Sequence, residues 1–122
     1  MAANPHRGEV EVVLDGATYP LRPDFEACVA IERALGASLV SLLRKAGQTG
    51  EQGYDLSVLE AGTIIAEGIK AAGRAQGNAE WQSYRAERIA ELVWREGLDK
   101  AVPAVSAFLV AAVTGGRTAG NA

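Results

Sequence analysis

The sequence predicts an α+β domain that is mainly helical, with an N-terminal β-hairpin followed by a bundle of four to five helices. Two observations predict this class: an alternating apolar pattern broken by Asp15-Gly16 near the N-terminus, and apolar residues at helical spacing over most of the remaining chain. At 122 residues the chain supports one core. We therefore expect a single globular domain over residues 9–114, with a flexible lead-in at 1–8 and a flexible tail at 115–122.

The β-hairpin is expected over residues 9–22. Apolar residues alternate with Glu9 and Glu11 along its first half, which is typical of a strand with one buried and one solvated face. Asp15-Gly16 favours a type I′ turn, because both central residues of that turn need positive φ. A two-stranded ribbon is marginal alone, so we expect its apolar face to lie over the first helix. That face carries Val12, Leu14, Tyr19 and Leu21.

Five helical segments follow, and most have a recognisable start or stop. Pro23-Asp24 suits the first turn of a helix, and Gly36 suits its end. Asn78 suits the start of the fourth helix and Gly97 its end. The predicted spans are about 24–35, 38–45, 56–73, 79–96 and 98–113. The stripe at helical spacing on the first helix consists of Phe25, Cys28, Val29, Glu32 and Leu35, with Ile31 beside it.

The third helix is rich in small residues, among them Gly62, Gly68 and Gly73. Each interior glycine costs about 1 kcal/mol relative to alanine. Close approach of a neighbouring helix explains such a cost, although the same glycines could instead leave the helix soft. We also consider this small-residue face as part of a groove for a partner helix.

The sequence offers no recognisable catalytic or metal-binding set. His6, the only histidine, lies in the lead-in, and without a second histidine or cysteine we expect no transition-metal site. The serines have no histidine partner for nucleophilic catalysis. The lone Cys28 lies on the predicted stripe of the first helix and is expected to be buried rather than reactive. We therefore predict a protein that is not an enzyme and uses no cofactor.

Charge and hydropathy narrow the choice of partners. The net charge is −3, so nucleic acid is not expected as a partner. The longest apolar run, Ala101 to Val113, is shorter than the ~20 residues that span a bilayer, so we expect no membrane span. The N-terminus also lacks the apolar core of a signal peptide. The sequence thus predicts a cytoplasmic protein with protein partners, and leaves a homo-oligomer open.

The fourth predicted helix carries the candidate interface residues. Trp94 lies far around this helix from its apolar stripe. Either the following helix folds back over Trp94, or the indole is an exposed anchor for a partner. Together with Trp94, we place Trp81, Tyr84 and Ala90 on the candidate protein interface.

Three segments carry a resemblance to a known family: HRGEVEVVLDGATYPLRPDFEACVAIERALGASLVSLL, GYDLSVLEAGTIIAEGIKAAG and AERIAELVWREGLDKAVPAVSAFLVAAV. With their order along the chain, the sequence resembles the tail assembly chaperone family of gene transfer agents and siphophage-like prophages. The resemblance implies a non-enzymatic protein that binds the tape measure protein and leaves as tail tube subunits polymerise around it. It supplies no catalytic residues. The alternative is a structural virion component, such as a head–tail connector, a tail terminator or a tube-associated protein.

Overall fold

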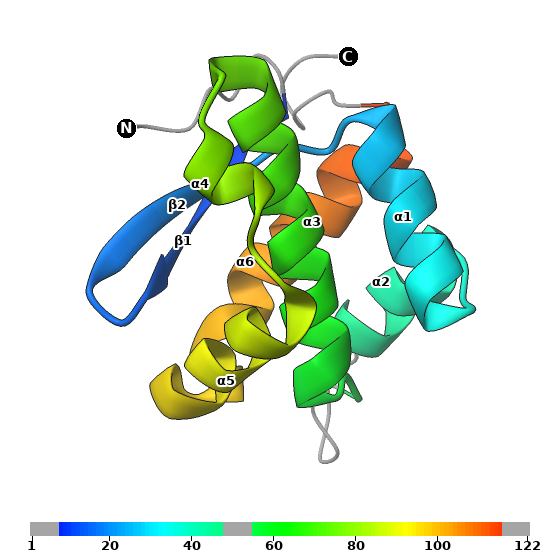
Figure 1. Cartoon of the computed structure of the whole chain (residues 1–122). Coiled ribbons are helices and arrows are strands. Elements are labelled where there is room, and N and C mark those ends of the chain that lie inside the picture. The colour runs from blue at the N-terminus through cyan, green and yellow to red at the C-terminus, as the bar shows by residue number, and fades with distance from the viewer. Residues whose placement is uncertain (1–7, 48–54, 116–122) are drawn as a thin grey trace.

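The computed structural model describes residues 8–47 and 55–115. Nearly all of the predicted lead-in, with His6, and nearly all of the predicted tail lie outside these residues, as do residues 48–54 between the second and third predicted helices. Within the described ranges a two-stranded antiparallel hairpin precedes six helices, which confirms the mainly helical α+β class (Figure 1). The elements are β1 Val10–Leu14, β2 Ala17–Leu21, α1 Phe25–Leu35, α2 Leu39–Gly47, α3 Val58–Gln76, α4 Ala79–Gln82, α5 Ala86–Glu96 and α6 Leu98–Val113.

The hairpin turns where the sequence predicts. Asp15 and Gly16 have φ of 52° and 80°, as a type I′ turn requires. The apolar face of the hairpin nevertheless packs on α3 and α6, so its predicted placement over α1 was wrong. The reason is local: the Arg22 amide donates a hydrogen bond to the Gly68 carbonyl of α3, at 3.0 Å, which directs β2 onto that helix.

Glu9, just before β1, and Glu11, within β1, lie in different environments. Glu11 is exposed, whereas Glu9 is buried despite its predicted place on the solvated face. Arg22 donates a hydrogen bond to the Glu9 carboxylate at 3.2 Å, so the buried charge is paired.

Helix α3 is the central element, with the hairpin on one side and α1 and α2 on the other (Figure 1). It packs against α1, α4, α5, α6 and β2. A Cβ placed on Gly62 would lie 2.6 Å from Ala90 Cα of α5, and one on Gly73 would lie 2.9 Å from Trp81 Cβ. Close approach therefore explains the glycines. Because these residues are buried inside the fold, the small-residue face of α3 is not the partner groove that we predicted.

Helix α1 has the predicted ends but a different buried face. Asp24 caps it by accepting a hydrogen bond from the Ala27 amide, and Gly36 ends it in the left-handed region. The residues that α1 buries are Ala27 and Ile31, one turn apart. The predicted stripe was therefore wrong, and Phe25 is 84% exposed.

The predicted single helix over 79–96 is two helices, α4 and α5, with a break at residues 83–85. The Ser83 hydroxyl donates a hydrogen bond to the Glu80 carbonyl at 2.7 Å, which competes with helical pairing. Arg85 then adopts extended backbone and precedes α5. Because the chain breaks here, α5 does not continue the direction of α4, and its Ala90 lies against Gly62 of α3.

Helix α3 is also shifted from its predicted span of 56–73. Ser57 and Glu60 form a reciprocal capping box at its start, which leaves Leu56 before the helix. At the other end the chain continues past Gly73 to Gln76, and Gly77 supplies the left-handed cap.

Candidate interaction surfaces

Two of the predicted interface residues, Trp81 and Tyr84, belong to an aromatic cluster with Tyr19 of β2. The Tyr19 ring lies 6.2 Å from the Trp81 ring and 5.9 Å from the Tyr84 ring, both edge-to-face. The Tyr84 hydroxyl donates a hydrogen bond to Glu80. Burial, followed by hydrogen bonding with Tyr19 and Glu80, raises the pKa of Tyr84 above its ordinary value. The cluster holds the α4–α5 break against the hairpin.

Ala90 lies at the closest contact between α5 and α3. Its exposed fraction is 8%, and it faces Gly62. A small side chain is needed here because any larger one would force the two backbones apart.

Trp94 is 71% exposed, so the following helix does not fold back over it. On the same helix Glu91 accepts hydrogen bonds from Arg88 and Arg95, each at 2.9 Å. The indole therefore stands beside charged, solvated side chains. Its exposure is the pattern of an aromatic anchor with a polar rim.

The four predicted residues thus do not form one surface. Trp81 and Tyr84 are half-buried, Ala90 is buried, and Trp94 alone among the four is exposed. An interface role for the set stays a prediction.

Sequence reasoning missed a second exposed aromatic residue, Phe25. It lines a groove of about 420 Å³ together with residues of α1, the start of α2 and the end of α6. Phe25 follows directly after the N-cap Asp24, and spacing alone assigned it to the buried stripe. The pair Ala27 and Ile31 was the signal for the true buried face.

Cys28 lines the same groove and is half-buried rather than fully buried. Burial raises the pKa of its thiol above the ordinary value, and the Asp24 and Glu32 carboxylates raise it further. The thiol is therefore protonated at neutral pH and lacks the electropositive setting of a reactive cysteine.

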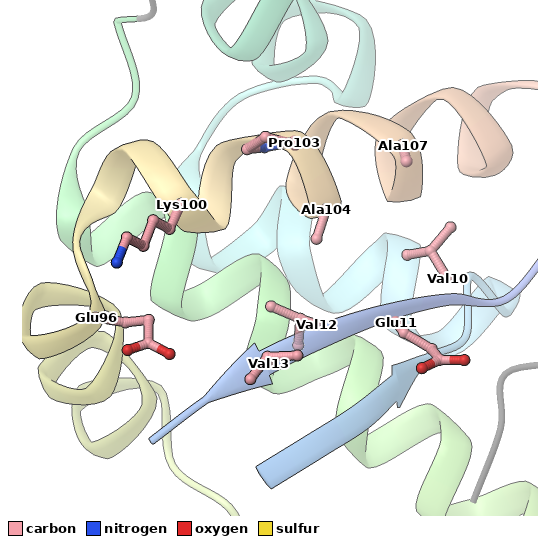
Figure 2. A pocket seen from close by; sticks show the side chains of 9 residues that line it. All are labelled: Val10, Glu11, Val12, Val13, Glu96, Lys100, Pro103, Ala104 and Ala107. Carbon is pink, nitrogen blue, oxygen red and sulfur yellow. The ribbon is translucent and has the colours of Figure 1, made fainter. Parts of the chain in front are cut away.

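A further groove, of about 490 Å³, lies between β1 and α6, and sequence reasoning missed it too. Figure 2 shows Val10 and Val12 pointing from β1 toward α6, and Ala104 pointing from α6 toward β1. Glu96 and Lys100 stand at the end of this groove near Val13. No sequence signal could have found it, because it depends on how the hairpin packs.

The described ranges contain neither a metal-binding cluster nor a membrane-spanning helix. No group of three or more His, Cys, Asp or Glu side chains there is arranged to hold a metal ion. None of the described helices has the length and apolar character needed to cross a bilayer.

The family described as "Phage tail tube protein, GTA-gp10" matches residues 7–115. The chain belongs to this family. Membership of the GTA-gp10 family confirms the resemblance to tail proteins of gene transfer agents and phages, and it implies protein partners in a phage-like tail. The comparisons with curated proteins and with solved structures gave no match.

Proposed function

We propose that this GTA-gp10 family protein is a non-enzymatic tail assembly chaperone or adaptor, which binds the tape measure protein in the cytoplasm while the tail is built. The observation that carries the proposal is the exposure of two aromatic side chains, Phe25 at 84% and Trp94 at 71%. Large aromatic residues on a surface are typical of protein-binding sites.

The protein does not need either side chain for its own core. Fully buried residues such as Phe108, Ile64 and Leu21 fill the interior, and none of the buried side-chain polar atoms described lacks a hydrogen-bond partner. Phe25 and Trp94 are therefore available to amphipathic helices of a long client, whose apolar faces would otherwise aggregate. As tube subunits assemble around the client, they would displace these contacts.

Co-expression with a helical fragment of the tape measure protein tests the proposal. We expect the fragment to move from the insoluble to the soluble fraction, and to co-purify with the protein. Trp94→Ala should weaken binding of the fragment about tenfold or more, as truncation of an aromatic anchor does. Val40→Ala is the matched control, since Val40 is 50% exposed and aliphatic.

Two results would contradict the chaperone proposal. One is a fragment that stays insoluble whether or not the protein is present. The other is equal binding by wild type, Trp94→Ala and Phe25→Ala, which would leave the exposed aromatic residues without a role.

The alternative is a structural component that remains in the tail. The description of the family as a tail tube protein favours it. On that alternative the exposed aromatic residues would contact other copies or tube subunits, and the purified protein should form homo-oligomers. Light scattering of wild type and Trp94→Ala distinguishes the two, because only an oligomer held by Trp94 dissociates in the variant.

A further inference from the structure

Helix α1 carries a partly apolar face that the fold leaves open. Phe25, Val29 and Glu32 follow helical spacing on the side of α1 opposite the buried pair Ala27 and Ile31. Phe25 is 84% exposed and Val29 is half-buried. Helices are held in proteins by packing of an apolar face, and the Ala27 face already does this for α1. The Phe25 face is therefore available for a second contact.

A groove lies beside the Phe25 face, where α1 meets the start of α2 and the end of α6 (Figure 1). It has a volume of about 420 Å³, and we call it the α1 groove. It is lined chiefly by Phe25, Cys28, Val29, Glu32, Leu39 and Ala112. All of these except Glu32 are apolar or weakly polar. The groove can therefore hold apolar side chains beside a single charged group.

The backbone around the α1 groove decides what form an occupant takes. The walls are helices, whose N–H and C=O groups pair within each helix. At the start of α2, where free N–H groups are expected, the Leu39 amide donates a hydrogen bond to the Glu32 carboxylate at 3.0 Å. Pro23, which also lines the groove, has no N–H. A strand would find few backbone partners here, whereas a helix satisfies its own backbone and needs only side-chain contacts.

Charge decides which helix fits. Among the described residues that line the α1 groove, Glu32 alone is charged. No ion pair joins Glu32 to a described residue, and one of its two carboxylate oxygens accepts no hydrogen bond from one. Burial raises the pKa of the Cys28 thiol, and the Asp24 and Glu32 carboxylates raise it further, so the groove is negative at the thiol. Asp24 is itself paired with Arg74 at 3.1 Å. A cation on the occupant would therefore complement Glu32.

The other side of the ridge formed by Phe25 and Val29 makes a less selective site. A groove of about 530 Å³ there is lined also by Glu26 and Arg33. These two side chains balance in charge, and Glu26 already forms an ion pair with Arg74 at 3.4 Å. Charge therefore favours no particular partner on that side, and the preference belongs to the α1 groove.

We propose that the α1 groove binds an amphipathic helix of the client protein. Two apolar side chains one turn apart lie against Phe25 and Val29, and an arginine or lysine one turn further faces Glu32. The helix comes from the client of the proposed function, on which this inference rests. A second copy docked through the same face would instead oppose one Glu32 carboxylate to another, since two-fold pairing brings the same surface of both copies together.

The probe is a fluorescent, alanine-rich peptide of about 16 residues, long enough to form a helix. Two leucines one turn apart form its apolar face. An arginine lies one turn beyond them on each side, so that either orientation brings a cation to Glu32. We expect the full chain to bind this peptide at least about fivefold more tightly than the same peptide with glutamate in place of arginine. A peptide of the same composition, with its leucines on opposite sides of the helix, should bind about tenfold more weakly.

Variants of the chain separate the charged part of the contact from the apolar part. Glu32→Gln keeps an oxygen that can accept the Leu39 hydrogen bond but removes the charge, so the preference for arginine over glutamate should disappear. Glu26→Gln is the matched control, since Glu26 lies on α1 but lines the other groove. Phe25→Ala should weaken binding of the arginine peptide about tenfold. Trp94→Ala on α5 should leave this binding unchanged.

Cys28 reports whether the peptide occupies the groove. It is the only cysteine in the chain, and it lines the groove. Alkylation with iodoacetamide at alkaline pH, where the thiolate forms, should therefore slow several-fold when the arginine peptide is bound at saturation. The glutamate peptide at the same concentration should slow it less, because it occupies a smaller fraction of the chains.

The outcomes assign the groove to one occupant. Equal binding of the arginine and glutamate peptides, or unchanged alkylation of Cys28 at saturating peptide, would overturn the proposal. Loss of binding in Trp94→Ala rather than in Phe25→Ala would move the contact to α5. A dimer in light scattering that Phe25→Ala converts to monomer would assign the groove to a second copy. Tighter peptide binding by a chain that ends at Gly115 would assign it to residues 116–122.

Failure of this inference can be told apart from failure of the chaperone proposal. If the peptide does not bind but the tape measure fragment is still made soluble, the α1 groove is not the docking site and the chaperone proposal stands. If the peptide binds as expected but the fragment stays insoluble, the groove binds helices and the chaperone proposal fails.

Discussion

Gly62 is the residue on which the contact between α3 and α5 most depends. A Cβ at this position would lie 2.6 Å from Ala90 Cα and Cβ, a distance that real side chains do not adopt. Gly62→Ala should therefore destabilise the protein by about 1–3 kcal/mol, although alanine favours a helix intrinsically. Gly47→Ala is the control, because a Cβ there meets nothing within 4 Å. Urea unfolding of both variants checks this. A stabilised Gly62→Ala would contradict the close contact.

The two tryptophans should respond differently to truncation. Trp94 is 71% exposed, so Trp94→Ala should change the free energy of unfolding by about 0.5 kcal/mol or less. Trp81 is half-buried against Tyr19, so Trp81→Ala should cost about 2–3 kcal/mol. Thermal melts compare the pair directly. Equal losses would mean that Trp94 is covered by part of the protein.

At the level of elements, the start of α3 links pH to stability. Burial by itself would raise the pKa of Glu60, but hydrogen bonds from Lys45, at 2.7 Å, and from Ser57 outweigh it, so the pKa is lowered. The ionised carboxylate therefore stabilises the folded state fully above its ordinary pKa of 4.5, and this contribution is lost as pH falls through the lowered value.

Glu60→Gln should accordingly lose about 1 kcal/mol at pH 7, a modest amount because the pair is partly exposed to solvent. The difference from wild type should shrink as pH falls below 4.5 and disappear once the pH is below the lowered pKa of Glu60 in the folded state, where the wild-type carboxylate is protonated too. Urea unfolding across this pH range measures it. Glu87→Gln is the control, since no ion pair joins Glu87 to a described residue. A pH-independent difference would show that the charge is not responsible.

The turn and the helix ends could be predicted from the sequence, whereas the break within the predicted fourth helix could not. A turn or a helix cap depends on residues that are neighbours in sequence. The hairpin turn at Asp15-Gly16 and the helix ends at Gly36 and Gly97 were therefore predicted correctly. The α4–α5 break was missed because it depends on a competing hydrogen bond from Ser83 and on aromatic packing against a distant strand. Apolar residues at helical spacing predict a helix, but the same spacing can continue across a break, so the pattern does not reveal where the chain turns.

At the scale of the whole molecule, the limit is the choice of packing partner. The sequence identified Val12, Leu14 and Leu21 as buried, but it assigned them to the wrong helix. The packing of the hairpin on α3 and α6 creates the β1–α6 groove. A prediction that places the hairpin on another helix therefore cannot reveal this groove. The position of Trp94 away from the apolar stripe was easier to predict, because its place around α5 follows from the helical repeat alone.

The composition of the finished particle tests the proposed function of the whole protein. A chaperone whose client contacts are taken over by tube subunits should be absent from purified particles, or present far below the tail tube protein in amount. Quantitative mass spectrometry of particles measures this, with the lysate before purification as the control for expression. A fixed ratio to the tube protein in the particle would instead establish a structural component. In that case we expect the Trp94→Ala variant to fold but to be missing from the particles. The exposed indole does not contribute to the core, so its removal should weaken only contacts with other subunits.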